Sequence, residues 1–413
     1  MNRLLLNVDF PIFVIEFIGP KHFLVGGGGG PSATGVPNGL EIFELITTPG
    51  SSEVGAKSVC RFKSGTYAIM NCAKHADGPI TYLACGHDDK CVVYSVKQKV
   101  ITPRPNSPDG QVRKRKSGLT KADDFKNAKK VISFDVKQLD SVVTDFHTED
   151  AYQSCSTFGS DGSHLLTAGA DGCIRMWKYP DMVKVWETKA HEQEVDVLQI
   201  NSSATQLCST SKDGKLLLWD AKDGKALAEL KWTSEPPIKY KHKACRYSML
   251  DRDPQKESLF SIEVPVANKK GAPSYITQWS INRHKAMNVH PVYMGSLACM
   301  DISTCGRYLA VGSMEGDVAV FNSINLKQIY HVKGAHKTFV TGLAFSPNSA
   351  AGLLVTNHSQ FSLVSISIDN QLKLHQPPQP SLWKSTCFLL VLLLLLSIIF
   401  AVFAMGFAED VLN

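Results

Sequence analysis

At 413 residues the chain is long enough for a large hydrophobic core, and its length alone predicts two or three domains. Its formal net charge is +6, but residues 97–130 hold eleven Lys or Arg against three Asp, a net +8, which leaves about −2 for the rest. The basic character therefore belongs to one segment, and a nucleic-acid-binding surface spread over the whole protein is excluded.

The eleven cysteines are scattered singly, and none forms a Cys-x-x-Cys pair. An odd, dispersed set indicates reduced thiols in the cytosol, used mostly as small core residues. No His/Cys cluster has the spacing of a zinc site. The N-terminal residues 1–9 lack an apolar run long enough for a signal peptide.

A glycine-rich stretch, residues 26–40, lies between two strand-like runs at 23–25 and 40–45. Its glycines favour backbone conformations with φ > 0, which leave amides and carbonyls open to a ligand. No Gly-Lys-Ser/Thr ending follows, so the stretch is not a P-loop. A strand and two prolines stand where a dinucleotide site needs a helix. Two interpretations remain: a floppy strand connection, or a cation-binding loop that faces a partner.

A short pattern recurs further along the chain, consisting of a small residue, a polar residue, Asp or Glu, Gly, an alternating run and an aromatic residue. It is clear at residues 169–177 and 210–219 and weaker at 86–94 and 312–321. Asp-Gly between alternating apolar runs predicts a hairpin, because the tight turn needs φ > 0. The aromatic spacing is 42 residues from Trp177 to Trp219 and again from Trp279 to Phe321, which is the period of a four-stranded propeller blade.

Seven positions are expected on the third strand of a blade, which predicts an all-β, seven-bladed propeller over residues 1–375 as one domain. These positions are Phe43, Tyr94, Trp177, Trp219, Trp279, Phe321 and Leu374. The last blade lacks an outer strand of its own. Residues 4–8, ahead of an inner strand expected near 13–18, are predicted to supply that strand and leave no open edge.

This pattern resembles the WD-repeat propeller family, in which a His before the inner strand hydrogen-bonds the turn Asp, and a Ser or Thr with the Trp completes a buried network. The expected pairs are His147 with Asp171, His191 with Asp213 and His290 with Glu315, and the expected partners are Thr167 with Trp177 and Ser209 or Ser211 with Trp219. Catalytic or metal-binding pairs are the alternative. Repetition at the blade period favours structure, since an active site is built once.

The basic insert, about residues 97–130, is predicted to be a solvated, disordered loop between two strands of the second blade. Attraction to an anionic membrane is the next interpretation. Nucleic acid or a nuclear import signal is a further option for the basic run 113–116. Nucleic-acid binding is disfavoured because Phe125 is the only aromatic residue in the insert.

The C-terminal region is predicted to be a tail anchor. Residues 376–385 form a Pro-rich stalk, 386–408 a transmembrane helix and 409–413 a lumenal tail. The 24 residues 385–408 carry no charge, and at 1.5 Å per residue they span a hydrocarbon core of roughly 30 Å. Trp383 and Lys384 place the preceding flank at the cytosolic interface.

The combination of propeller, glycine-rich loop and C-terminal membrane helix resembles a family of ER-membrane guanine-nucleotide exchange factors. These proteins act on the small GTPase that starts COPII coat assembly for ER-to-Golgi transport. The resemblance implies a regulator without a chemical step of its own, held in the ER membrane by one span with its propeller in the cytosol. It also implies a loop that binds potassium and faces the GTPase.

By this resemblance Asn38 contacts the GTPase and is needed for exchange, and Val36 and Pro37 are presented beside it as a small wedge. The potassium ligands implied, mainly backbone carbonyls, belong to Gly27, Gly28, Gly29, Gly30, Gly35 and Asn38. Two other functions stay open at this point. One is a membrane-tethered, DNA-binding transcription regulator that uses residues 97–130, and the other is an anchored scaffold without exchange activity.

Overall fold

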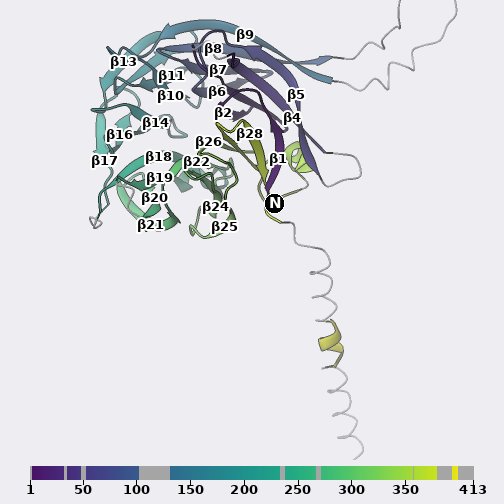
Figure 1. Ribbon diagram of the computed structural model, residues 1–413. Coiled ribbons are helices and arrows are strands. Elements are labelled where there is room, and N and C mark those ends of the chain that lie inside the picture. The colour runs from purple at the N-terminus through teal and green to yellow at the C-terminus, as the bar shows by residue number, and fades with distance from the viewer. Residues whose placement is uncertain are drawn as a thin grey trace, which may run out of the picture.

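The computed structural model describes residues 2–31, 35–47, 53–101, 131–232, 238–266, 271–356, 358–378 and 393–398. Within these ranges, seven four-stranded antiparallel sheets are arranged as blades around a central channel (Figure 1). The predicted seven-bladed, all-β propeller is confirmed. Every expected third-strand residue, from Phe43 to Leu374, lies on the third strand of its blade.

The strands of blades 1 to 4, from the channel outward, are β2 Ile12–Phe17, β3 His22–Gly27, β4 Gly39–Thr47 and β5 Val54–Lys63; β6 Asn71–Asp77, β7 Ile80–His87, β8 Lys90–Ile101 and β9 Val131–Val143; β10 Gln153–Phe158, β11 His164–Gly169, β12 Cys173–Lys178 and β13 Val183–Lys189; β14 Val195–Ile200, β15 Gln206–Ser211, β16 Leu216–Asp220 and β17 Ala226–Glu229.

The strands of blades 5 to 7 are β18 Tyr240–Met249, β19 Glu257–Pro265, β20 Pro273–Ser280 and β21 Lys285–Met294; β22 Leu297–Ile302, β23 Tyr308–Ser313, β24 Val318–Asn322 and β25 Gln328–Val332; β26 Val340–Phe345, β27 Leu363–Ser367, β28 Gln371–His375 and β1 Asn2–Asn7. In the described connections, three short helical turns lie between strands, at η1 Leu250–Arg252, η2 Pro254–Lys256 and α1 Ala350–Val355.

The ring is closed by the N-terminus, as predicted. β1 pairs antiparallel with β28, with Asn2 opposite His375, and Figure 1 shows the two strands side by side. Leu5 and Leu6 of β1 pack against the apolar core shared by blades 1 and 7. The outer strand of the last blade thus comes from the opposite end of the chain, and the third strand of that blade has no open edge.

The strand order assigns each connection to one of two faces. The inner strands start on the same face, since the Asn71 side chain at the start of β6 donates to the Gln153 carbonyl at the start of β10 (2.7 Å). Because the strands of each blade alternate in direction, the second-to-third and blade-to-blade connections share this face, which we call the loop face. First-to-second and third-to-fourth connections lie on the opposite face, which we call the exit face because β28 ends there.

The predicted buried network is confirmed in blade 4. The imidazole of His191 contacts Asp213 through Nδ1 (3.0 Å) and Ser209 through Nε2 (2.7 Å), and the indole N–H of Trp219 donates to Ser209 (2.9 Å). Gly214 closes the Asp-Gly turn with φ of +89°. The network therefore ties a blade-to-blade connection to the turn of the next hairpin and to its third strand.

The other two predicted His pairs are wrong. In blade 3 the carboxylate of Asp171 binds the buried Arg175 (2.6 Å), and the imidazole of His147 accepts only weak N–H contacts from its own turn. The bond from the indole of Trp177 to Thr167 (2.8 Å) is as predicted. In blade 6 Glu315 accepts from the hydroxyl of Tyr293 (3.1 Å). His290 lies exposed on outer strand β21 instead of before an inner strand.

Two equivalent networks were not predicted. In blade 5 His242 contacts Glu263 (3.0 Å), on the second strand instead of in the turn. In blade 7 His336 contacts Asp369 (3.1 Å) and Ser365 (2.7 Å), 33 residues separate the His and the Asp, and His375 replaces the Trp. The spacing is longer there because α1 lengthens the first hairpin of the blade.

Several expectations fall partly outside the described residues. Residues 97–101 belong to β8, so the expected insert begins later than predicted, and 102–130 lie outside the described ranges. Of the expected stalk and membrane helix, only 376–378 and 393–398 are described, and the latter are helical. Among the residues that the structure describes, no helix is long and apolar enough to cross a membrane.

Candidate partner-binding loop

The glycine loop, residues 28–38, connects β3 to β4 on the loop face, and two glycines at its start are required by close approach. A Cβ on Gly27 would collide with the carbonyl oxygen of Pro11, to which the N–H of Gly28 donates (3.1 Å). Gly28 has φ of +142°, and a Cβ there would collide with the side-chain oxygen of Asn38. A side chain at either position would therefore displace the backbone of the loop from Pro11 and Asn38.

Asn38 organises the glycine loop. Its side-chain oxygen accepts from the N–H of Gly30 (3.0 Å), and its Nδ2 donates to the carbonyls of Gly30 (3.1 Å), Gly65 (3.2 Å) and Thr66 (2.7 Å). The half-buried amide thus contacts backbone groups of two separate segments. In this structure Asn38 points into the protein and links the glycine loop to the 64–70 connection between blades 1 and 2.

The 64–70 connection is joined to the glycine loop by backbone bonds as well. The N–H of Ser64 donates to the Asn38 carbonyl (3.1 Å), and that of Ile69 to the Gly27 carbonyl (3.4 Å). Tyr67 and Met70 are 40% and 44% exposed beside it. The sequence contained no signal for this second segment, because its contribution is made by carbonyl oxygens that every residue carries.

The remaining predicted residues are divided between the surface and the core. Gly30 and Gly35 have φ of +76° and +78° with open space around them, a conformation that other residues adopt at a cost. Gly29 and Pro37 are half-buried. Val36 is also half-buried and packs against the core shared by blades 1 and 7, so it is partly anchored instead of projecting freely. Residues 32–34, within the loop, lie outside the described residues.

The donor set of the loop consists of neutral oxygens. Among the described residues, no group of three or more His, Cys, Asp or Glu side chains lies close enough to hold a metal ion. Three carbonyl oxygens, of Gly30, Gly65 and Thr66, converge instead on the amide nitrogen of Asn38. Uncharged backbone carbonyls suit a hard monovalent cation. Neutral oxygens are thus what this loop offers to an ion, and the carbonyl of Gly30, one of the predicted ligands, accepts from the Asn38 amide here.

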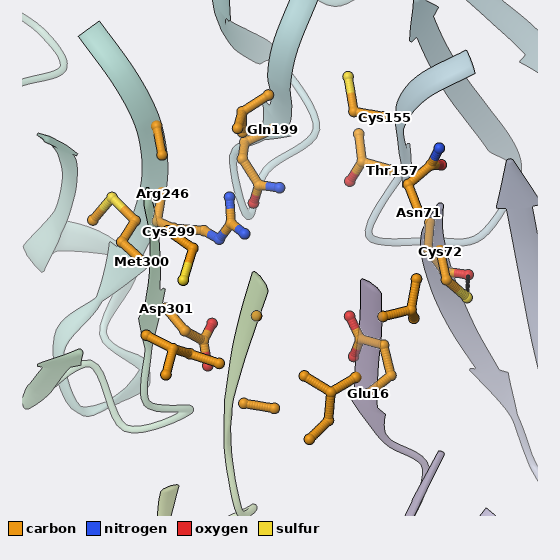
Figure 2. A pocket seen from close by; sticks show the side chains of 18 of the residues that line it. Glu16, Asn71, Cys72, Cys155, Thr157, Gln199, Arg246, Cys299, Met300 and Asp301 are labelled. Atoms are coloured by element: carbon orange, nitrogen blue, oxygen red, sulfur yellow. Dashed lines mark hydrogen bonds between the residues drawn. The ribbon is translucent and has the colours of Figure 1, made fainter. Parts of the chain in front are cut away.

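The central channel is a second feature with polar side chains. It encloses a cavity of about 620 Å³ lined by the inner strands, and Figure 2 shows Glu16, Arg246 and Asp301 pointing into it. Most of its charges are paired, with Lys74 on Glu16 (2.7 Å) and Lys243 on Asp196 (3.1 Å). Residues of the channel come from all seven blades, so it is part of the scaffold.

Asp301, which lies in the channel, makes the stability of the folded protein depend on pH. Loss of hydration raises the pKa of Asp301 from 3.8 to about 6, although Arg246 acts in the opposite direction. The folded state therefore holds this proton more tightly than the unfolded state, and stability declines as the pH rises from about 4 to about 6.

We expect Asp301→Asn to increase the free energy of unfolding relative to the wild type at pH 8 and to leave it nearly unchanged at pH 4. The amide oxygen still accepts from the N–H of Phe345, which Asp301 binds at 3.0 Å. Urea unfolding across this pH range measures the difference. Asp77→Asn, at an exposed position, is the matched control. An equal gain at both pH values would contradict the assignment.

The comparisons with known proteins give one family match and several relatives. Residues 141–178 and 182–220 match the family described as WD domain, G-beta repeat. The guanine nucleotide-exchange factor SEC12 of Rattus norvegicus is 29% identical over 387 residues, which cover 91% of this chain and 90% of the relative. SEC12 of Mus musculus is 28% identical over the same extent, and SEC12-like protein 1 of Arabidopsis thaliana is 28% identical over 54% of this chain.

The seven blades make this chain a seven-bladed propeller, and two segments of it are similar to the WD repeat. The first matched segment begins near the end of outer strand β9, and the second begins just before outer strand β13, so the sequence repeat starts one strand ahead of the structural blade. Over nine-tenths of its length the chain is similar to the SEC12 guanine nucleotide-exchange factors of rat and mouse.

Proposed function

We propose that this protein is a guanine-nucleotide exchange factor that releases GDP from the small GTPase of COPII coat assembly at the ER membrane. The homology to SEC12 over nearly the full length of both chains supports this function. The observation that carries the assignment of the site is the tie made by Asn38 between the glycine loop and the 64–70 connection. Regulation of a GTPase requires no chemical step from the protein itself.

The glycine loop acts by favouring the open state of the GTPase. A GTPase holds its nucleotide through Mg²⁺ and ordered switch loops. A partner that binds the nucleotide-poor state more tightly lowers the barrier to GDP release by that difference in affinity. Asn38, with Val36 and Pro37 beside it, forms the contact that makes this difference. Its amide either reaches the switch backbone directly or holds in place the two segments that do.

A potassium ion is the cofactor of this loop. The ion would be held mainly by backbone carbonyls of Gly27, Gly28, Gly29, Gly30 and Gly35, together with Asn38. When bound, it neutralises the mutual repulsion of converging carbonyl dipoles and so stabilises one loop conformation. The glycines permit carbonyls to turn inward, and Pro37 restricts the chain as it leaves the loop. A loop ordered before docking avoids the entropy loss that a mobile loop would suffer.

The two faces of the propeller support a membrane arrangement. β28 ends on the exit face, and the β8–β9 connection, whose described ends are residues 101 and 131, lies on the same face. A single C-terminal span and a basic insert that attracts anionic lipid would then act on one side of the propeller. The glycine loop lies on the opposite face, in the cytosol, where a GTPase has access to it.

Nucleotide release from a purified COPII GTPase, measured in potassium and in sodium at equal ionic strength, tests both parts of this proposal. We expect the protein to accelerate release, and to do so more strongly in potassium. Equal acceleration in both salts would contradict the potassium site but would still support the exchange function. No acceleration in either salt would contradict the exchange function.

A further inference from the structure

A groove lies on the loop face between blades 4 and 5, away from the glycine loop of blade 1. It has a volume of about 700 Å³ and is lined by the turn after β15, residues 229–232 and 238–242, and the end of β19, while residues 233–237 lie outside the described residues. We call it the lysine groove. Its size lies in the range of about 300–1,000 Å³ that is typical of binding sites.

The floor of the lysine groove is apolar and aromatic. Trp232 and Tyr240 line it, and both pack against Tyr275, with ring centroids 5.1–5.4 Å apart. The indole N–H of Trp232 is already used by the hydroxyl of Thr277 (2.9 Å). Val266 stands at the edge of the groove and is 50% exposed. An apolar side chain of a ligand would be buried here at little polar cost.

The rim of the groove is basic, and its carboxylates are already occupied. Its five lysines are Lys212, Lys215, Lys231, Lys239 and Lys241. Asp213 contacts His191, Glu263 contacts His242, and Glu229 pairs with Lys231 (2.9 Å).

Lys212 pairs with Glu194, outside the groove lining. Lys215, Lys239 and Lys241 make no ion pair with any residue in the described part of the chain. The described lining thus holds five lysines against three carboxylates, an excess of two positive charges.

We propose that the lysine groove binds an acidic peptide segment of a partner protein, with one apolar side chain of the peptide on the Trp232 floor and its carboxylates on Lys215, Lys239 and Lys241. The charge complementarity favours a polyanion, and the apolar floor favours a peptide among the polyanions. This inference does not depend on the exchange function.

The test uses the full-length protein and a fluorescein-labelled peptide of about twelve residues, in which Asp and Glu flank a central Leu-Phe pair. Fluorescence anisotropy measures its affinity. The triple variant K215E/K239E/K241E is expected to bind the peptide at least about tenfold more weakly. The matched control K57E/K285E/K327E changes the net charge equally at exposed lysines outside the groove, and it should bind within about twofold of the wild type.

A second variant separates the apolar floor from the charges. Val266→Asp places a carboxylate at the groove edge, where half of the side chain is already exposed, so the fold should be retained, as thermal melting verifies. This variant should bind the Leu-Phe peptide more weakly than the wild type does. A peptide with Ser-Ser in place of Leu-Phe should bind the wild type more weakly than the Leu-Phe peptide does.

Three outcomes would overturn the proposal. They are equal losses in the two lysine triples, equal affinity for the Leu-Phe and Ser-Ser peptides, and binding of anionic vesicles or RNA through these lysines in the absence of peptide binding.

Discussion

Asn38→Ala should slow the release of GDP from the partner GTPase about 100-fold, with the propeller still folded. A factor of 100 corresponds to about 2.7 kcal/mol of lost stabilisation of the nucleotide-poor state. The substitution removes a donor to three carbonyls and an acceptor for the N–H of Gly30. The glycine loop and the 64–70 connection then lose the side chain that links them, so both must become ordered each time the GTPase binds, at a cost in entropy. Release of a fluorescent GDP analogue measures the effect.

The controls separate this effect from damage to the fold. Asn325→Ala removes a comparable turn amide, whose oxygen accepts from the N–H of Lys327 (3.0 Å) in the β24–β25 connection on the exit face, and should leave exchange unchanged. Asn38→Asp keeps the acceptor for Gly30 but loses the donors and sets a carboxylate against carbonyl oxygens, so it should not rescue exchange. Exchange at the wild-type rate by Asn38→Ala would contradict the assigned site.

Deletion of residues 2–7 should have the largest effect on stability. It removes β1 and leaves β28 as an open edge, and it strips Leu5 and Leu6 from the core shared by blades 1 and 7. Both leucines are partly buried, so each contributes about 1 kcal/mol, and the two side chains alone predict a loss of about 2 kcal/mol and a fall in Tm of about 3 °C. Differential scanning calorimetry measures the Tm, and light scattering measures the aggregation that an unpaired edge favours.

Leu4→Lys is the matched control for this deletion. Leu4 lies on the same strand but is 46% exposed, so a charged side chain there reaches water and the strand pairing is kept. The variant should melt close to the wild type. If the deletion also melted there as a monodisperse protein, closure of the ring by the N-terminus would contribute little to stability.

The buried networks show how far local sequence spacing can predict contacts. His191, Asp213 and Trp219 were predicted correctly because blade 4 has standard connections, and spacing along the chain then equals spacing in space. In blade 7, α1 separates His336 from Asp369, and the pair no longer has the repeat spacing. The contact survives because the fold needs a buried donor and acceptor at that place, whatever the length of the connection.

The sequence by itself determined the seven blades and the closing role of the N-terminus, because both follow from turn glycines, alternating apolar runs and a repeat length, all of which are local. It also located the glycine loop and Asn38. Only the tertiary structure decided that Asn38 points inward to the carbonyls of Gly65 and Thr66, and that Val36 is partly core. Contacts between backbone groups of different blades leave no mark on residue type, so they exist only once the blades are packed around the channel.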